Sequence, residues 1–397
     1  MSNNPAAEAF PGLTDIHAHP AMNAFLWDRD LRRHYWTGRT FDPLASLTDF
    51  KMLKKGGVKV LWSSLHIPEP PFFKCSLIRL AAHFTAGGRK LLKLNAWECL
   101  LAMMGQMERQ VARAGDGFEV ARSNLELDRV LTAGKTAIVH TVEGGHVLGA
   151  GLDAKDTAGR IRRLEELAER GVASVTLAHL FPNELAGHAE AIPAAQRTFP
   201  ICKLNTGVDL SRGLTTMGRD VVERMVDLRM IPDVTHCTPV ARRDVYELVA
   251  NRIPIIASHN GVESMNPEKY NLDRSDIRAI AESGGVVGVI FMPYWLDRSQ
   301  PGPGLEPIWK TMDTVRKLSG GSWEHVAIGT DFDGFTDPPD DCDSEAKLPL
   351  IREMLEAKGV SGNDADAVLG TNARRLLRDG WRQQHQRSSR DSAARAA

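Results

Sequence analysis

The chain has 397 residues, of which 43% are hydrophobic and 25% are charged, and its formal net charge is −1. This composition is typical of a globular protein with a sizeable core, and a charge this close to zero argues against a nucleic-acid partner. The amino terminus lacks a secretory signal pattern, and no run reaches the roughly 18 apolar residues of a membrane span. An odd number of cysteines without paired spacing favours reduced thiols in a cytoplasmic protein: Cys75, Cys99, Cys202, Cys237 and Cys342.

Eight short apolar runs, separated by helical patterns, are expected to be strands. They cover residues 13–20, 58–65, 135–144, 172–180, 230–237, 253–259, 286–292 and 325–334. Near-continuous apolar runs are typical of parallel strands that are buried on both faces. The pattern predicts a (β/α)8 TIM barrel with inserted loops and C-terminal helices. A doubly wound open sheet is the alternative, which the lack of a Gly-rich phosphate motif after the first strand disfavours.

The connections between these runs add helices and one long loop. Helical patterns cover 42–54, with Asp42 suited to the N-cap, and 76–86, 97–114 and 118–132. Residues 181–212 have no clear period, and loops of this length are usually lids or binding loops. We expect a flexible N-terminus at 1–11, a single barrel domain at 12–380 and a disordered tail at 381–397.

The first run, LTDIHAHP, carries two histidines two residues apart, His17 and His19. Side chains at i and i+2 of a strand project from the same face, so both imidazoles are directed toward one point. Two nitrogen ligands of one metal ion have this spacing, and so do two surface histidines at the start of a loop. The spacing alone does not decide between these interpretations.

Ionisable residues at the ends of six of the eight runs favour the metal interpretation. They are His17 and His19, Glu143, His179, His236, His259 and Asp331. Any single one is compatible with a hydrogen-bonded core residue, but ionisable groups are costly to bury unpaired. The carboxyl ends of barrel strands meet on one rim, which is where catalytic groups of this fold stand. Together these residues predict a metal site on that rim.

Four histidines and a carboxylate exceed the needs of one tetrahedral ion, so two ions with a bridging carboxylate are expected. Glu143 is the natural bridge, with His17 and His19 on one ion and His236 and His259 on the other. A water shared by two such ions loses its proton near neutral pH and becomes a nucleophile. Asp331 is then the expected general base and acid, and His179 is placed to stabilise an oxyanion.

Other polar residues are expected to have structural roles. Asp15 and Asp333 suit turns or support of the ligands, and His140 and His146 suit hydrogen bonding around Glu143. Cys237 is directed away from His236 along the strand and suits core packing. The remaining histidines carry no context: His34, His66, His83, His188, His325 and His385.

Several motifs, in this order, resemble those of the renal (membrane) dipeptidases, di-zinc members of the amidohydrolase superfamily. They are VEGGHVLG, TLAHLFPN, GLTTMGRDVVERM followed by IPDVTHCTP, PIIASHNG and IGTDFDG. The resemblance runs from about residue 12 to the GTNARRLL segment at 370–377. It implies a (β/α)8 barrel, two zinc ions bridged by glutamate, and hydrolysis of dipeptides, and it allows a homodimer. It makes Glu143, His236 and His259 metal ligands, His179 the contact to the tetrahedral intermediate and Asp331 the proton shuttle.

The chain departs from this family at two places. The family's first strand usually reads His-x-Asp, whereas His19 supplies a neutral ligand here, which increases Lewis acidity and weakens retention of that ion. The family also places an arginine, which grips the substrate carboxylate, just before an Asn. In PEKYNLD that place belongs to Tyr270, and Lys269 or Arg274 is left to supply the charge.

Three hypotheses follow. The first is a zinc-dependent dipeptidase whose small-molecule substrates include dipeptides with a D-residue at the carboxyl position, bound with the help of His179, Tyr270 and Lys269. The second is an amidohydrolase that acts on another amide, a lactone or an ester, because Tyr270 replaces the arginine. The third is a metal-binding protein whose catalysis has decayed, which the retained polar set disfavours.

Overall fold

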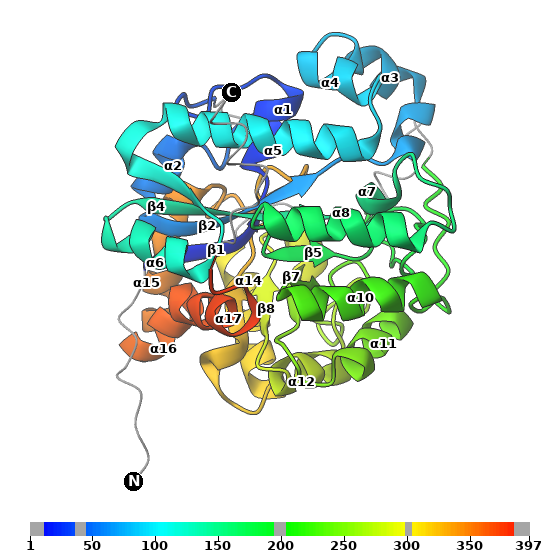
Figure 1. The fold of residues 1–397 in the computed structure, drawn as a ribbon. Helices are drawn as coiled ribbons and strands as arrows, with labels where there is room; N and C mark the ends of the chain where they lie inside the picture. The colour runs from blue at the N-terminus through cyan, green and yellow to red at the C-terminus, as the bar shows by residue number, and fades with distance from the viewer. Residues whose placement is uncertain (1–11, 36–44, 194–203, 298–303, 385–397) are drawn as a thin grey trace.

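A closed barrel of eight parallel strands forms the centre of the computed structural model, which describes residues 12–35, 45–193, 204–297 and 304–384. The strands are β1 (Leu13–Ala18), β2 (Val58–His66), β4 (Thr136–Glu143), β5 (Ser174–Thr176), β6 (Ile231–Asp233), β7 (Ile256–Asn260), β8 (Val286–Val289) and β9 (Val326–Ile328). Pairing of β1 with β9 and of β2 with β4 closes the ring. Figure 1 labels β1, β2, β4, β5, β7 and β8 of this ring. The predicted (β/α)8 barrel is confirmed.

A ninth strand, β3 (Phe118–Ala121), occupies part of the segment 118–132 that was expected to be helical throughout. Strand β3 pairs with the first half of β4 along one edge of β4. Strand β2 pairs with β4 along the opposite edge, where Val60 lies next to Ala137. The second half of the edge that faces β3 pairs with β5. The expectation was wrong because β4 begins before β5 does and leaves edge groups that β3 satisfies. The helix α6 (Asn124–Thr132) starts only after Ser123, whose hydroxyl accepts from the amide of Glu126.

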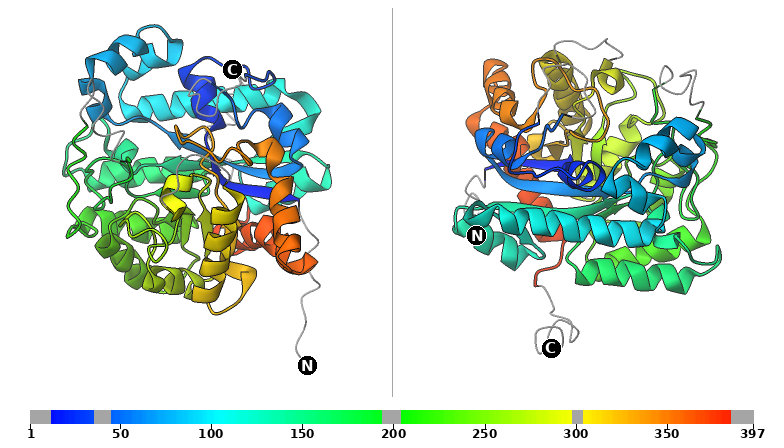
Figure 2. Two further views of the ribbon diagram at one scale, coloured as in Figure 1. Left: turned by 180° about the vertical axis from the view of Figure 1, so that it is seen from behind. Right: turned by 90° about the horizontal axis from the view of Figure 1, so that it is seen from above.

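Helices surround the strands on the outside (Figure 2). They are α1 (Pro20–Leu26), α2 (Phe50–Lys55), α3 (Ser76–Ala82), α4 (Ala86–Leu91), α5 (Ala96–Arg113), α7 (His146–Gly149), α8 (Thr157–Glu169), α10 (Thr216–Leu228), α11 (Pro239–Val249), α12 (Arg274–Glu282), α13 (Pro293–Asp297), α14 (Leu305–Leu318), α15 (Pro349–Ala357), α16 (Gly362–Asp366) and α17 (Asn372–Gly380). Helix α2 begins after Asp49, which caps it, and the expected cap Asp42 lies outside the described residues. The short helices α3 and α4 project beyond the ring, next to the 3-10 helix η1 (Pro70–Lys74).

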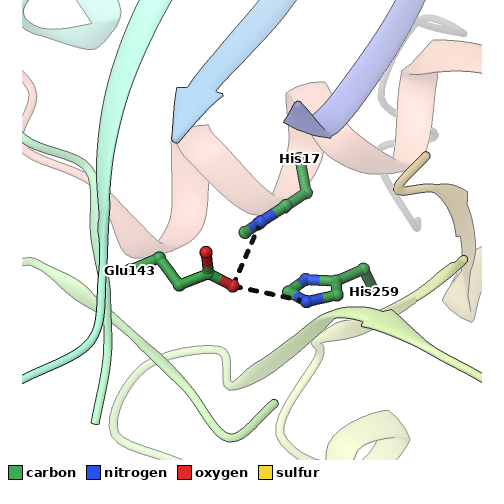
Figure 3. Close-up of side chains that lie close together, drawn as sticks. All are labelled: His17, Glu143 and His259. Carbon is green, nitrogen blue, oxygen red and sulfur yellow. Dashed lines mark ion pairs between the residues drawn. The ribbon is translucent and has the colours of Figure 1, made fainter. Parts of the chain in front are cut away.

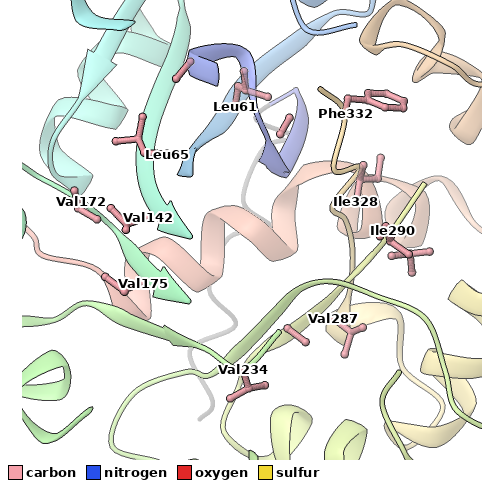
Figure 4. Close-up of a cluster of buried hydrophobic side chains, with 14 of the residues drawn as sticks. Leu61, Leu65, Val142, Val172, Val175, Val234, Val287, Ile290, Ile328 and Phe332 are labelled. Carbon is pink, nitrogen blue, oxygen red and sulfur yellow. The ribbon is translucent and has the colours of Figure 1, made fainter. Parts of the chain in front are cut away.

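The core consists of two layers because alternate strand residues point to opposite faces. Val60 and Trp62 of β2 belong to a buried cluster that includes Leu376 and Leu377 of α17. Leu61 and Leu65 belong to the cluster that packs against the outer helices (Figure 4). Helix α17 contacts residues at the beginning of the strands and so covers the amino-terminal end of the barrel. The carboxyl ends of the strands are left to carry the site.

Two expectations about the ends and the cysteines need revision. Trp381 is fully buried, and the carbonyls of Arg382 and Gln383 accept from backbone amides of α6, so the packed chain extends beyond residue 380. The rest of the expected tail and residues 1–11 lie outside the described residues. Cys75 is disulfide-bonded, so the expectation of reduced thiols is wrong for this residue. Within the described ranges, no helix is long and apolar enough to cross a membrane.

Candidate metal centre and active site

Glu143, at the end of β4, faces His17 of β1 and His259 of β7 (Figure 3). Its Oε1 atom is 3.4 Å from Nε2 of His17 and 3.4 Å from Nε2 of His259. The same oxygen is 3.3 Å from Nε2 of His236, and Oε2 is 3.4 Å from Nε2 of His19. All five side chains are buried. The rim therefore gathers one carboxylate and four imidazoles around one point.

The histidines form two pairs. Nε2 of His17 is 3.1 Å from Nε2 of His19, and Nε2 of His236 is 3.2 Å from Nε2 of His259. Two ligand atoms that each lie about 2.1 Å from one tetrahedral ion are roughly 3.4 Å apart. The distances within each histidine pair, and from the histidines to Glu143, are close to this value. His17, Glu143 and His259 also form a group of three that is able to hold an ion. The donor set fits two metal ions.

The protonation of these groups agrees with a metal centre. Burial lowers the pKa of His236 to about 4 and holds the pKa of His259 well below its ordinary value. Burial alone would raise the pKa of Glu143, but the charge of His179 holds it well below its ordinary value. Neutral imidazole and ionised carboxylate are the forms that bind metal.

Asp15 fixes the first pair of histidines. Its Oδ1 accepts from the backbone amides of His17 at 3.0 Å and Thr330 at 3.1 Å, and its Oδ2 accepts from the Thr330 hydroxyl at 2.5 Å. It is fully buried and so ties the end of β1 to the segment after β9. The structural role expected for Asp15 agrees with these contacts.

Asp233 supports the second pair of histidines in the same way, although no sequence pattern pointed to this residue. Its Oδ1 accepts from the backbone amides of Thr235 at 3.0 Å and Ser258 at 3.2 Å. Its Oδ2 accepts from the hydroxyls of Ser258 at 2.6 Å and Thr176 at 2.8 Å. Asp233 thus holds the ends of β5, β6 and β7 together beneath His236. The backbone of His236 has φ +67°, a conformation that non-glycine residues adopt rarely and mostly at functional sites.

Asp331 lies beside the first pair. Its Oδ1 is 3.1 Å from Nε2 of His19 and 3.9 Å from Nε2 of His17, and its backbone has φ +61°. Burial raises the pKa of Asp331 well above its ordinary value, so this carboxyl can hold a proton. Gly334 lies against it, since a Cβ at that position would be 2.2 Å from Asp331 Oδ1. The geometry suits a group that takes up and returns a proton.

His179 has a buried carboxylate partner that the sequence did not reveal, Glu69. Glu69 Oε1 accepts from the backbone amide of Leu180 at 3.0 Å and lies 2.8 Å from Nδ1 of His179. Nε2 of His179 faces Glu143 Oε2 at 3.7 Å. Burial alone would lower the pKa of His179, but the charges of Glu69 and Glu143 raise it to about 9. A cationic imidazole with one nitrogen anchored suits contact with a developing oxyanion.

His66 also belongs to the site, contrary to the expectation that it is an ordinary histidine. Its ring centroid is 4.1 Å from that of His179, and its Nε2 is 3.6 Å from Glu69 Oε2. His66 is the last residue of β2, so its place on the rim follows the same rule as the other site residues. The expected strand ended one residue too early to show it.

Two of the expected substrate-binding residues, Tyr270 and Lys269, have different positions relative to the metal-site residues. The Tyr270 ring lies 5.2 Å from that of His236, and its hydroxyl donates to the carbonyl of His259 at 2.6 Å. Lys269 is half exposed, and its amino group pairs with Glu263. Arg274 is exposed at the start of α12. A loop residue's side-chain direction is set by contacts that the sequence does not display.

The buried Arg242 explains how this loop is held. It pairs with Asp276 at 2.9 Å and donates to the carbonyls of Lys269 at 3.2 Å and Tyr270 at 3.3 Å. Both terminal nitrogens of its guanidinium are therefore occupied by protein groups. Tyr270 is positioned as part of the wall of the site rather than as a free donor.

The other predicted supporting residues have mixed outcomes. Asp333 accepts from the amides of Leu47 at 2.9 Å and Thr48 at 3.1 Å and so holds the loop before α2. Nε2 of His146 lies 2.9 Å from the carbonyl of Ile67, close to the site. His140 faces the outer side of β4, three residues before Glu143, and its ring nitrogens have no hydrogen-bond partner. Cys237 is buried and free, as the core interpretation predicted.

Comparison with known proteins gives the chain a family. The curated relatives include an uncharacterised protein from the region 5′ of pqqA in Klebsiella pneumoniae, 34% identical over 178 residues. That match covers 44% of this chain and 64% of the relative. They also include the dipeptidase tcpJ of Claviceps purpurea, 24% identical over 69% of this chain and 58% of the relative. The chain therefore spans less than two thirds of the length of either relative.

Solved structures show the same fold. A metallo peptidase from Rhodobacter sphaeroides, liganded with a phosphinate mimic of the dipeptide L-Ala-D-Ala, matches with a TM-score of 0.72 and 23% identity. The match covers 93% of this chain and 99% of that protein. The family model of the membrane dipeptidases matches residues 15–390, nearly the whole chain. The chain thus belongs to the membrane dipeptidase family, peptidase family M19.

Proposed function

We propose that the protein is a metal-dependent hydrolase that cleaves the amide bond of dipeptides or closely related amides. The observation that carries this proposal is Glu143 between two histidine pairs, with Asp331 and His179 beside it. Membership of the membrane dipeptidase family supports it. The relative tcpJ is a dipeptidase, and the Rhodobacter protein binds a mimic of L-Ala-D-Ala. Dipeptides with a D-residue at the carboxyl position are therefore among the proposed substrates.

Two zinc ions are the proposed cofactors, with Glu143 as the shared ligand. His17 and His19 would hold one ion, and His236 and His259 the other. When bound, such ions polarise a carbonyl and lower the pKa of water, so that a nucleophile is available at neutral pH.

The chain's own residues supply the proton transfer and the charge stabilisation. Asp331 accepts a proton as the carbonyl is attacked and returns it to the leaving amine, and its raised pKa suits both steps. His179, anchored by Glu69, donates from Nε2 to the oxygen that becomes negatively charged. Because the whole set is buried, its charges are poorly screened by bulk solvent, which strengthens these interactions.

The test combines metal analysis with one substitution. We expect about two zinc equivalents per chain, cleavage of L-Ala-D-Ala, and loss of cleavage with a chelator. Asp331→Asn should lower turnover by about 10²–10⁴-fold while both ions stay bound. Full turnover in this variant would exclude the role of Asp331. Tight metal binding without cleavage of any dipeptide or related amide would instead support a protein whose catalysis has decayed.

A second candidate function is hydrolysis of a different amide, a lactone or an ester. The hydroxyl of Tyr270 donates a hydrogen bond to the backbone carbonyl of His259, and the amino group of Lys269 pairs with Glu263. Neither group is therefore available to bind a substrate carboxylate. A panel of dipeptides, N-acyl amino acids and lactones separates the two candidates by their kcat/KM values.

A further inference from the structure

A cavity of about 500 Å³ opens directly above the metal-site residues. His19, Glu143, His179, His236 and Asp331 form its polar floor. Cavities of about 300–1,000 Å³ hold ligands of drug size, larger than the backbone of a small dipeptide requires. The cavity leaves space for a sizeable group attached to the bond that is cleaved.

The walls of this cavity are apolar and come mostly from segments outside the barrel strands. One wall includes Leu26, Trp27, Phe72, Phe73, Ile78 and Leu91, from α1, η1, α3 and α4. The lining also includes Met292 and Trp295, which follow β8. Apolar surface of this kind favours an apolar group because contact removes both surfaces from water.

The charges of the same helices are directed elsewhere. Arg79 of α3 and Arg89 of α4 line a separate hollow, behind Phe73 and Leu91. Among the residues that the structure describes, no Lys or Arg lines the cavity above the metal-site residues. Arg242, the buried arginine nearest in the sequence to the Tyr270 loop, is occupied by Asp276 and by backbone carbonyls. Among the described residues of these walls, therefore, no Lys or Arg is available to pair with a substrate carboxylate.

We propose that this cavity binds a bulky apolar group, aromatic or long alkyl, on one side of the scissile amide, and that recognition does not depend on a free substrate carboxylate. The proposal rests on the proposed function for the site of cleavage, but the binding of an apolar group is independent of it. The helices α3 and α4 are then the elements that determine specificity.

The experiment compares matched substrates with the metal-loaded protein. Ala-Ala, Phe-Ala, Ala-Phe and the carboxyl-terminal amide of each are supplied, and kcat/KM is measured. We expect one of the two phenylalanine positions to raise kcat/KM by about tenfold or more over Ala-Ala, as apolar pockets do for larger side chains. We expect the amides to be cleaved as well as the free acids. No preference for phenylalanine, or loss of cleavage on amidation, would overturn the proposal.

Two neighbouring residues of α3 provide a matched pair of variants. Ile78 lines the cavity, whereas Leu77 is 49% exposed and does not. Ile78→Asp should lower the ratio of kcat/KM for the preferred phenylalanine dipeptide to that for Ala-Ala to about one, whereas Leu77→Asp should leave this ratio unchanged. Equal effects of the two substitutions would overturn the proposal.

A binding measurement separates this proposal from the proposed function. The neutral probe N-phenyl-1-naphthylamine gains fluorescence in apolar cavities, and its binding needs no turnover. We expect Ile78→Asp to weaken its binding about tenfold and Leu77→Asp to leave it unchanged. If no substrate is cleaved but the probe follows this pattern, the proposed function fails and the cavity assignment stands. If dipeptides are cleaved but the probe does not bind, the cavity assignment fails and the proposed function stands.

Discussion

The two sides of the metal site use the same support in different ways. On the side of β1 and β9, both histidines come from one segment, and Asp15 ties that segment to Thr330. On the side of β6 and β7, one histidine comes from each strand end, and Asp233 ties those ends together. In both cases a buried carboxylate satisfies backbone amides at the point where the strands end.

This difference shows which part of the site can be recognised from residues that are close together in the sequence. The pair His17 and His19 is visible as a two-residue spacing, so the first side is recognisable within one strand. The pair His236 and His259 is separated by α11 and meets only because β6 and β7 are neighbours in the barrel. Glu143 joins the sides, because its carboxylate faces histidines of both.

The largest effect is expected from a change to the residue that the two sides share. Glu143→Gln removes the carboxylate that lies between the four imidazoles, so both ions should be lost. Turnover should fall by about 10³-fold or more, since metal ions contribute several kcal/mol to such reactions. Metal content and kcat are measured together. Glu108→Gln is the control, because Glu108 faces His140 on the outer side of β4. Retention of both ions in Glu143→Gln would show that the sides do not depend on this residue.

Changing one side at a time is expected to have the next largest effect. Asp15→Asn and Asp233→Asn each remove a carboxylate that orients one pair of ligands, which typically costs about 10–100-fold in metal affinity. Each single variant should weaken one metal equivalent and leave the other unchanged, and the double variant should weaken both. Metal release to a competing chelator measures this. Weakening of both equivalents by either single substitution would show that the two sides act as one unit.

A smaller effect is expected from crowding the first side only. Gly334→Ala would place a methyl group 2.2 Å from Asp331 Oδ1 and 2.9 Å from His19 Cδ2. Both distances are too short for unbonded atoms, so these side chains must move. Misplacement by about 1 Å can cost roughly 100-fold in rate, and Gly334→Ala should lower kcat by about 10–100-fold. Gly362→Ala is the matched control, since nothing lies within 4 Å of a Cβ there. Unchanged kcat in Gly334→Ala would mean that Asp331 tolerates displacement.

The smallest effect on activity is expected at His140, which lies on the same strand as Glu143 but on the opposite face. Burial lowers the pKa of His140 to about 4, below its ordinary value of 6.5. Between these two pH values the imidazole of His140 is protonated in the unfolded chain but not in the folded protein. The free energy of unfolding therefore falls as the pH decreases from about 6.5 to about 4. At pH 4 the free energy of unfolding is expected to be about 3 kcal/mol lower than at pH 7 because of this residue.

Denaturant unfolding at pH 7 and pH 4 measures this contribution. His140→Leu should reduce the difference in unfolding free energy between the two pH values by about 3 kcal/mol. Its kcat at pH 7 should stay unchanged, since His140 contacts neither side of the site. An unchanged difference would show that His140 is protonated in the folded protein.

Much of the fold and of the polar rim follows from the sequence, for an identifiable reason. Buried parallel strands read as apolar runs, and in a barrel their carboxyl ends converge, so the residues that end each run are neighbours whatever their separation in sequence. His17, Glu143, His236 and His259 were found in this way. The same rule would have found His66 if the end of its strand had been placed one residue later.

The sequence by itself thus determined the barrel and the residues around Glu143, because both depend on the regular direction of side chains along a strand. Only the tertiary structure decided which loop residues join them. It brought in Glu69, paired Lys269 with a carboxylate, engaged the hydroxyl of Tyr270 and placed the apolar helices over the metal-site residues. The physical reason is that loop backbones have no fixed period, so the direction of their side chains depends on packing and hydrogen bonds to distant parts of the chain.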